Sequence, residues 1–541
     1  MADRGIARRE FLEITAAGLG GASVARRLTH RAVPLAPTRL ADFELEEATI
    51  ESLQSGMGSG RYTARSIAQL YLDRIAELDR QGPTIRSVIE LNPEGLAIAE
   101  ALDAERTARG PRGPLHGIPV LLKDNIDTAD RMATSAGSLA LASSIVSQDA
   151  TIARKLREAG AVILGKTNLS EWANFRSTHS SSGWSGRGGQ TKNPYVLDRN
   201  PCGSSSGSGA AIAANFCSIA VGTETDGSIV CPANNCGLVG IKPTVGLVSR
   251  SGIIPIAASQ DTAGPMTRTV ADAAILLTAL QGADDRDSAT RILLNRPRED
   301  FTTALLPGGL RGARLGVARN FFGFNDRVDA AMESALAALK AEGAILVDPA
   351  NFPTAGQFDD DEFEVLLYEF KAGINSYLAG LGPRSVVRNL DDLIAWNERE
   401  KEREMPFFGQ EIFRMASEKG PLTSPAYRNA LARCRRLSRR QGIDALVAKH
   451  RLDAIVAPTG GPAWTTDHLN GDHFSGGSST PAAVAGYPAI TVPAGAVFDL
   501  PVGLTFFGPA WSEHRLIRYA YGFEQATRHR RPPAFRPTSE A

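Results

Sequence analysis

Two loops that contain glycine and serine carry hydroxyl groups where a covalent nucleophile can be built. The first, residues 203–209, leads into a run of small residues at 210–215 that predicts a helix. The second, residues 223–229, follows a short apolar stretch that predicts a strand. Gly227 frees the backbone for an unusual conformation immediately before Ser228. Consecutive backbone amides at such a turn can stabilise an oxyanion beside a serine nucleophile.

The first loop allows three interpretations. It lacks both the Gly-Lys-Ser/Thr ending of a phosphate-binding loop and any lysine. Gly203, Ser205 and Gly207 match the Gly-x-Ser-x-Gly pattern of a nucleophile elbow, but residues 193–202 contain no convincing strand. A flexible linker is not expected to run directly into a tightly packed alanine helix. Either serine loop alone is therefore a weak indication of catalysis.

A lysine at the end of an apolar strand supplies the base that a serine nucleophile needs. Residues 117–124 predict a short buried strand that reaches Lys123 through the apolar run 118–122. An unperturbed lysine has a pKa near ~10.4 and is protonated at neutral pH. Because burial disfavours the ammonium form, these surroundings should lower the pKa of Lys123 and let the neutral amine accept a proton.

The strand ending in lysine, the serine-rich loop and the Gly-Ser turn together resemble the amidase signature family of hydrolases. Residues 201–243 are similar to that family's signature almost throughout. Other matching stretches occur in the family's order, at 165–172, 485–489 and 500–504. The resemblance implies that Ser228 is the nucleophile, Ser204 a bridging serine on a cis peptide and Lys123 the base.

The same resemblance implies a fold and a substrate site. The fold would be α/β, a large mixed central β-sheet surrounded by helices. The amides of Thr225, Asp226, Gly227 and Ser228 would receive the oxyanion, and Ala173 occupies a position that faces the substrate carbonyl pocket. Chemistry of this kind requires no metal and no organic cofactor.

Two positions depart from the family pattern. Asp226 and Ser206 stand where the signature usually has glycine. The oxyanion hole remains feasible because backbone amides supply it, but Asp226 could change the electrostatics or the substrate choice of the site. The form Thr-Glu-Thr-Asp-Gly-Ser, with residues 181–185 and 189–190 upstream, is similar to the branch that contains bacterial peptide amidases.

Composition excludes several classes of protein. The 541 residues include 59 Lys and Arg against 59 Asp and Glu, so the composition has no excess of positive charge of the kind that binds nucleic acid. No stretch approaches the roughly 20 apolar residues of a membrane-spanning helix. Five cysteines are too few for a disulfide scaffold. Cys231 and Cys236 could bridge, but small buried thiols are the favoured interpretation.

Alternating strand and helix patterns agree with an α/β fold. Thr63 is a plausible N-cap in an α-rich entry region that begins at Phe43. Further strands are expected at 161–165, 219–222, 453–458 and 489–493, and helices at 151–159 and 516–525. We expect an amidase domain over 37–541, with its signature core at about 115–270. Residues from about 326 to 450 are mostly charged helix and are interpreted as an inserted or peripheral region.

Weaker candidates lie outside the serine loops. Four residues on one loop suggest a metal site, but their Gly, Thr and Asn surroundings favour a solvated loop: Asp467, His468, Asp472 and His473. Trp172 and Phe175 could line a pocket, although aromatic residues on a helix are more often part of the core.

The leading functional interpretation is an exported amidase that hydrolyses a small-molecule or peptide carboxamide to the acid and ammonia or an amine. One alternative is the glutaminase-type subunit of the tRNA-dependent amidotransferase, which works with partner subunits inside the cell. Another is a serine esterase that uses Ser205 and a histidine. The sequence does not indicate an oligomeric state.

The N-terminal residues 1–36 resemble a twin-arginine export signal with its spacer. Arg8 and Arg9 precede a mildly apolar, Ala- and Gly-rich stretch at 14–25, and residues 23–25 form a small-x-Ala cleavage pattern. A periplasmic or secreted location is therefore expected. If this interpretation fails, the protein is cytoplasmic.

Export can be tested at the arginine pair itself. Changing Arg8→Lys and Arg9→Lys together should leave the protein in the cytoplasm, because the twin-arginine pathway reads the pair and not merely its positive charge. Fractionation of cells that express the wild type and the variant measures the outcome. An unchanged periplasmic yield of the variant would contradict the prediction.

Overall fold

A mixed β-sheet of eleven strands runs through the part of the chain that the computed structural model describes, residues 43–383 and 385–539. The strand order is β1-β3-β2-β6-β8-β7-β12-β13-β11-β9-β10. Neighbouring strands are parallel for β2 with β3 and β6 and for β9 with β10 and β11, and otherwise antiparallel. The strands of this sheet are β1 (Val88–Leu91), β2 (Pro119–Lys123), β3 (Val162–Thr167), β6 (Ile219–Glu224), β7 (Val239–Lys242), β8 (Thr262–Thr267), β9 (Arg314–Val317), β10 (Ile345–Val347), β11 (Ala454–Pro458), β12 (Ala489–Val497) and β13 (Leu500–Phe507).

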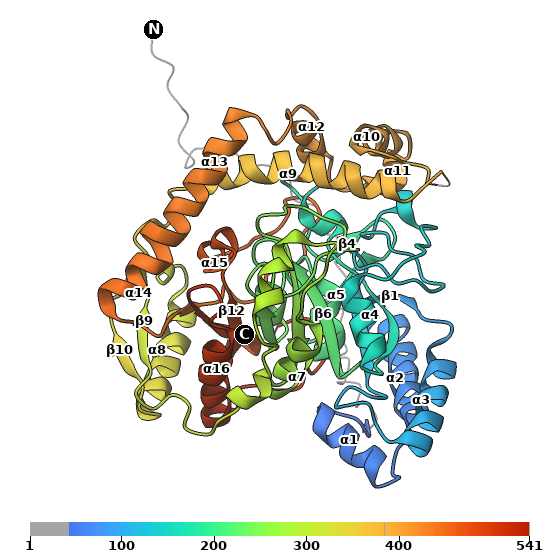
Figure 1. Ribbon diagram of the computed structural model, residues 1–541, viewed down its shortest axis with the longest axis horizontal. Coiled ribbons are helices and arrows are strands. Elements are labelled where there is room, and N and C mark those ends of the chain that lie inside the picture. Colours follow the sequence, from blue (N-terminus) through green and yellow to red (C-terminus); the bar gives the residue numbers. More distant parts are fainter. Residues whose placement is uncertain (1–42, 384, 540–541) are drawn as a thin grey trace, which may run out of the picture. The chain divides into compact units, whose positions relative to one another are not determined.

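Helices surround this sheet, so the predicted fold class is confirmed (Figure 1). They are α1 (Ile50–Gly58), α2 (Ala64–Ile75), α3 (Gly95–Arg109), α4 (Thr151–Glu158), α5 (Ser206–Ala213), α6 (Val230–Asn235), α7 (Val270–Leu280), α8 (Asp326–Ala341), α9 (Asp359–Gly380), α10 (Leu390–Arg399), α11 (Lys401–Glu404), α12 (Glu411–Ser417), α13 (Pro425–Arg435), α14 (Asp444–His450), α15 (Thr480–Ala485) and α16 (Glu513–Thr527). A separate hairpin joins β4 (Trp184–Ser185) to β5 (Gly189–Gln190). Within the ranges described, no helix has the length and apolar character needed to cross a membrane.

The elements that carry the predicted site lie close to their expected positions. Strand β2 ends at Lys123, and Thr63 caps α2 with a side chain that accepts from the Ser66 amide. Helix α5 begins at Ser206, earlier than the run of small residues at 210–215 predicted. A Cβ atom on Gly207 would lie 2.4 Å from the Asn168 carbonyl oxygen.

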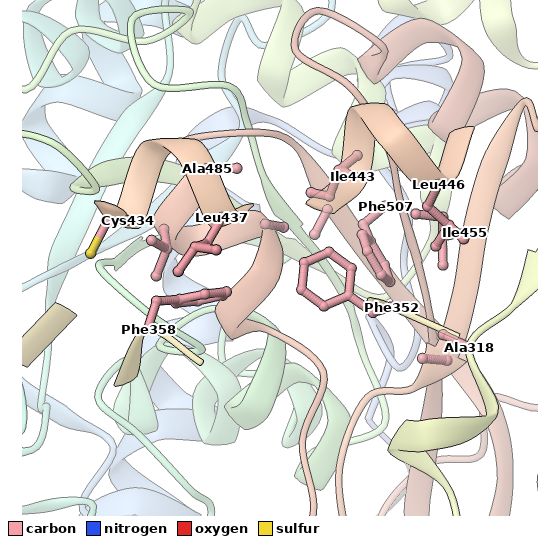
Figure 2. Close-up of a cluster of buried hydrophobic side chains, with 14 of the residues drawn as sticks. Ala318, Phe352, Phe358, Cys434, Leu437, Ile443, Leu446, Ile455, Ala485 and Phe507 are labelled. Carbon is pink, nitrogen blue, oxygen red and sulfur yellow. The ribbon is translucent and has the colours of Figure 1, made fainter. Parts of the chain in front are cut away.

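The region from 326 to 450 is mostly helical, and Figure 1 shows α9, α10, α12 and α13 gathered along one side of the sheet. It also contains β10, which pairs with β9 at the sheet edge. A buried apolar cluster joins this region to β11, β13 and α15 (Figure 2). Phe352, Leu437, Ile455 and Ala485 are among its members. The expected export segment, residues 1–36, lies outside the described residues.

A disulfide joins Cys202 to Cys231, so the expectation of unpaired thiols is wrong for this pair. Cys236, the alternative partner considered for Cys231, is buried and free. Cys231 lies in the first turn of α6 and Cys236 is its C-cap, which points their side chains in different directions around the helix. The bridge connects the chain just before Ser204 to the chain just after Ser228.

Removing this disulfide should lower the free energy of unfolding by about 3 kcal/mol, because the bond closes a loop across 29 positions in the unfolded chain. Denaturant unfolding of the Cys202→Ser, Cys231→Ser double variant against the wild type measures the loss. With reductant present the two proteins should unfold at nearly the same denaturant concentration. If five thiols of the unfolded, unreduced protein react with an alkylating reagent, the bond is absent.

Candidate active site

Lys123 lies at the end of β2, between the parallel neighbours β3 and β6, and is fully buried. Its Nζ atom is 2.7 Å from Ser204 Oγ, 2.9 Å from Thr223 Oγ1 and 3.2 Å from the Thr223 carbonyl oxygen. Two of its three partners are therefore hydroxyl groups, which can donate as well as accept a proton. The structure brings together two of the three residues predicted to form the catalytic unit.

Burial lowers the pKa of Lys123 to about 7, against the opposing effect of the Glu224 and Asp261 carboxylates. Both carboxylates are engaged elsewhere. Glu224 Oε2 accepts from the amides of Ile229 and Val230 at the start of α6, at 2.7 and 3.0 Å. A substantial fraction of Lys123 is therefore neutral near pH 7 and can act as a base.

Ser204 follows a cis peptide bond to Gly203, as the family resemblance implies. Its carbonyl oxygen accepts from the Ser170 amide at 3.1 Å, which holds the loop against the chain after β3. The neighbouring Ser205 is buried, and its Oγ donates to the Thr223 carbonyl oxygen at 3.0 Å and accepts from the Thr223 amide at 3.2 Å. The Ser205 hydroxyl is thus occupied by backbone groups.

Ser228 lies in the turn between β6 and α6, and the turn touches the first serine loop. The Ser228 carbonyl oxygen accepts from the Ser205 amide at 3.1 Å. Gly227 has φ +77, a left-handed conformation that glycine adopts without steric cost. Among the hydrogen bonds of residues 43–383 and 385–539, none is donated by the amides of Asp226, Gly227 or Ser228. These donors remain available to a substrate oxyanion.

The side chains of the turn are anchored on two sides. Thr225 Oγ1 donates to Asp261 Oδ1 at 2.6 Å. The Asp226 carboxylate accepts from the hydroxyls of Ser479 and Thr480, which lie at the start of α15. The contacts of four residues were not predicted from the sequence: Glu224, Asp261, Ser479 and Thr480. Only Glu224 offered a signal, as an acidic residue shortly before a helix start.

Ala173 lies in a strained turn beside a cavity of about 420 Å³. The φ values of Trp172, Ala173 and Asn174 are 49°, 54° and 69°, which residues other than glycine rarely adopt. The cavity is also lined by Asn125 and Thr225, so Ala173 faces an open space next to the turn that carries Ser228.

The remaining candidates have structural partners. Trp172 and Phe175 are buried in an apolar cluster with residues of α9 and α12, in agreement with a core position. Asp472 accepts from the Ser182 amide, Asp467 accepts from the amides of Leu469 and Asn470, and His468 stacks on Phe407.

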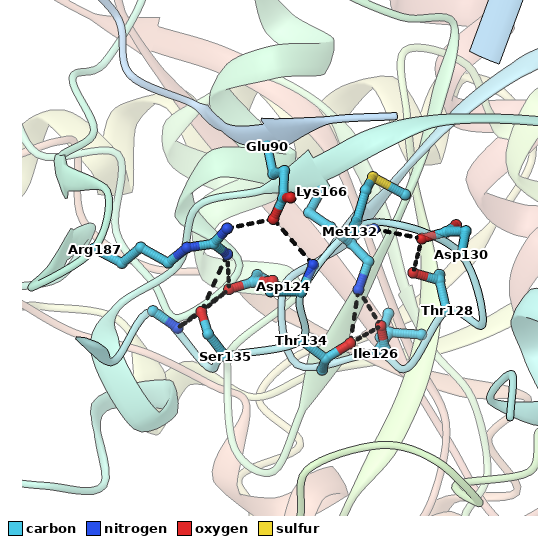
Figure 3. Close-up of polar contacts among 12 residues, drawn as sticks. Glu90, Asp124, Ile126, Thr128, Asp130, Met132, Thr134, Ser135, Lys166 and Arg187 are labelled. Atoms are coloured by element: carbon cyan, nitrogen blue, oxygen red, sulfur yellow. Dashed lines mark hydrogen bonds and ion pairs between the residues drawn. The ribbon is translucent and has the colours of Figure 1, made fainter. Parts of the chain in front are cut away.

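A second buried lysine, Lys166 on β3, lies in a separate polar network (Figure 3). Its Nζ donates to the Ile126 carbonyl oxygen and to Thr134 Oγ1. Nearby, Asp124 accepts from Ser135 Oγ, and Arg187 joins it to Glu90. Lys166 therefore stabilises the chain after β2 and has no serine-loop partner among the residues described.

The chain is similar to known amidases along most of its length. Residues 66–517 match the family model described as Amidase. A probable amidase of Arabidopsis thaliana is 42% identical over 504 residues, which cover 91% of this chain and 92% of that protein. The crystal structure of native peptide amidase from Stenotrophomonas maltophilia is 53% identical with a TM-score of 0.87, and the match covers 91% of this chain and 100% of that one.

A glutamyl-tRNA(Gln) amidotransferase subunit from Alkaliphilus metalliredigens is also similar, at 34% identity over 494 residues. That match covers 89% of this chain and 97% of the relative. The chain therefore belongs to the amidase signature family and is a hydrolase that acts on the carbon–nitrogen bonds of amides.

Proposed function

We propose that the enzyme hydrolyses carboxamides, and specifically the C-terminal amide of peptides, with Ser228 as nucleophile, Ser204 as proton relay and Lys123 as base. The observation that carries the proposal is the buried Lys123 Nζ, 2.7 Å from Ser204 Oγ in a loop that contacts Ser228. The 53% identity to a peptide amidase supports the choice of substrate.

The first chemical step transfers a proton through Ser204. Neutral Lys123 accepts the Ser204 hydroxyl proton while Ser204 Oγ takes the proton of Ser228. Ser228 Oγ then bonds to the amide carbon, and the carbonyl π electrons move to oxygen. The amides of the turn that carries Asp226, Gly227 and Ser228 stabilise the resulting oxyanion.

The second step releases the amine. The Lys123 ammonium returns its proton through Ser204 to the leaving nitrogen, the C–N bond breaks and an acyl-enzyme on Ser228 remains. Water then attacks the acyl carbon, with the same relay accepting its proton, and the free acid leaves. The chain's own residues supply every proton transfer in this sequence.

Two alternative functions receive less support. The 34% identity to an amidotransferase subunit is well below the 53% identity to the peptide amidase. An esterase that uses Ser205 is disfavoured because the Ser205 hydroxyl is hydrogen-bonded to the Thr223 backbone at both its donor and its acceptor side.

Export in folded form through residues 1–36 is part of the same proposal. The Cys202–Cys231 disulfide supports it, because such bonds persist in oxidising compartments such as the periplasm and are rare in the cytosol.

Purified enzyme should release ammonia from a peptide amide without any partner protein, with a kcat/KM far above that for free glutamine. Measurements on a peptide amide, glutamine and a nitrophenyl ester distinguish the three functions. Glutamine as the preferred substrate would favour the amidotransferase-type activity, and hydrolysis confined to the ester would favour the esterase.

The matched controls are the serines of the two loops. Ser228→Ala should lower peptide-amide turnover by about a thousand-fold or more while the protein stays folded. Ser205→Ala removes a structural hydroxyl and should keep most of the turnover. The opposite pattern would assign the nucleophile to Ser205.

The base role of Lys123 predicts a pH dependence. Because burial lowers the pKa of Lys123 to about 7, kcat/KM should fall as the pH drops below about 7, where protonation removes the proton acceptor. Lys123→Arg keeps a positive charge but cannot become neutral, so its turnover should fall by more than about a thousand-fold. A pH–rate profile of each protein measures both effects.

Lys166→Met is the control, since it removes a buried lysine of the neighbouring strand. This variant should be less stable, but its remaining activity should still fall as the pH drops below about 7. Substantial turnover of Lys123→Arg with an unchanged acidic limb would exclude Lys123 as the base.

A further inference from the structure

Asp226 departs from the family pattern at the centre of the oxyanion turn. We propose that Asp226 is a positioning residue that fixes the oxyanion amides by tying the turn to the start of α15. This inference rests on the proposed function, since it concerns how the same site stabilises its transition state.

The tie consists of hydrogen bonds between residues more than 250 positions apart. Ser479 Oγ donates to Asp226 Oδ1, and Thr480 Oγ1 donates to Asp226 Oδ2 at 2.7 Å. Each carboxylate oxygen therefore has its own hydroxyl donor, which fixes both the position and the rotation of the group. Hydrogen bonds to an ionised acceptor are stronger than those between neutral groups.

The start of α15 is itself held in place. Ser478 Oγ donates to the Pro458 carbonyl oxygen at the end of β11, at 2.7 Å. Ala482 and Ala485 of α15 are fully buried in the apolar cluster of Figure 2, beside η7 (Arg436–Ile443) and β13. Asp226 thus connects the turn to a part of the structure that is fixed by sheet and core.

The other side of the turn is anchored independently. Thr225 Oγ1 donates to Asp261, whose second oxygen accepts from the amides of Ile256 and Ala257, each at 2.9 Å. Gly227 packs against the start of α15 without a side chain of its own, since a Cβ atom there would lie 3.1 Å from Ser479 Oγ. Among the described residues, the hydrogen bonds between the turn and the start of α15 are those of the Asp226 side chain.

A tie of this kind acts on the transition state. The amides of Asp226, Gly227 and Ser228 are strong oxyanion donors only if they already point at the position that the oxyanion will occupy. Without these contacts the turn is still held at Thr225 and at the Ser228 carbonyl oxygen, so the peptide groups on either side of Asp226, between these two anchors, are the ones that can rotate. Loss of the tie should lower kcat and leave KM nearly unchanged, because the substrate's ground state makes little use of these donors.

The test compares variants that differ in hydrogen bonding and in charge. Asp226→Ala removes both, whereas Asp226→Asn removes the charge but can still accept from one hydroxyl and donate to the other. We expect kcat on a peptide amide to fall by about 10- to 100-fold in Asp226→Ala, with KM within about twofold, and to be largely restored in Asp226→Asn.

The partner side supplies a double-mutant cycle. The Ser479→Ala, Thr480→Val variant should lower kcat about as much as Asp226→Ala, and the triple variant should be little worse than either. Inhibition by a peptide aldehyde, which forms an oxyanion-like adduct with a serine hydroxyl, should weaken in parallel with kcat/KM. Thermal unfolding and single-turnover titration of the active sites check that each variant is folded.

Three results would overturn the proposal: wild-type kcat in folded Asp226→Ala, a rise in KM that accounts for the whole loss, or Asp226→Asn as impaired as Asp226→Ala. The last would assign Asp226 an electrostatic role. The Ser228→Ala variant separates this proposal from the proposed function. Activity in that variant would show that Ser228 is not the nucleophile and would refute the proposed function. An inactive Ser228→Ala beside a fully active Asp226→Ala would refute only the tie.

Discussion

The removal of the Lys123 amine from water is the constraint on which the site depends. A central strand with a parallel neighbour on each side buries this amine completely, and burial disfavours its charged form. The two carboxylates that could restore the charge, Glu224 and Asp261, are committed to backbone amides and to Thr225. Burial therefore outweighs the opposing effect of these carboxylates and lowers the pKa of Lys123 to about 7, so that the amine can be neutral near pH 7.

Strand β6 links Lys123 to the rest of the candidate site. Its residue Thr223 contacts Lys123 Nζ with both its hydroxyl and its carbonyl group, and the chain then turns within a few residues to Ser228. Glu224 caps the helix that follows, so the turn is held between the end of a buried strand and the start of α6. The proposed nucleophile and the surroundings of the proposed base are thus positioned by one continuous segment.

Local patterns sufficed to predict the α/β class, the strand that ends at Lys123 and the two serine loops, because each depends on neighbouring residues, whereas the mixed sheet was implied by the resemblance to a family. Contacts between distant segments were not predictable in this way. The partners of Asp226 lie at the start of α15, and Asp261 reaches Thr225 from the chain before β8. The disulfide was missed for a related reason: Cys202 meets Cys231 only once the two serine loops lie side by side, whereas the nearer Cys236 is turned away by α6.

Three lysines are buried in the part of the chain that the structure describes, and their partners explain why only Lys123 suits the proposed proton transfer. Lys242 donates to the carbonyl oxygens of Pro243 and Tyr487. A carbonyl oxygen accepts a hydrogen bond but has no proton to give to a neutral lysine. Lys166 contacts a carbonyl oxygen and Thr134 Oγ1, whose own proton is directed at the Ile126 carbonyl oxygen. Ser204 Oγ, by contrast, has no hydrogen-bond partner other than Lys123 among the residues described, so its proton is free to move. Burial lowers the pKa of a lysine so that its neutral amine can accept a proton. Only a lysine next to a hydroxyl group without another hydrogen-bond partner has a proton to accept.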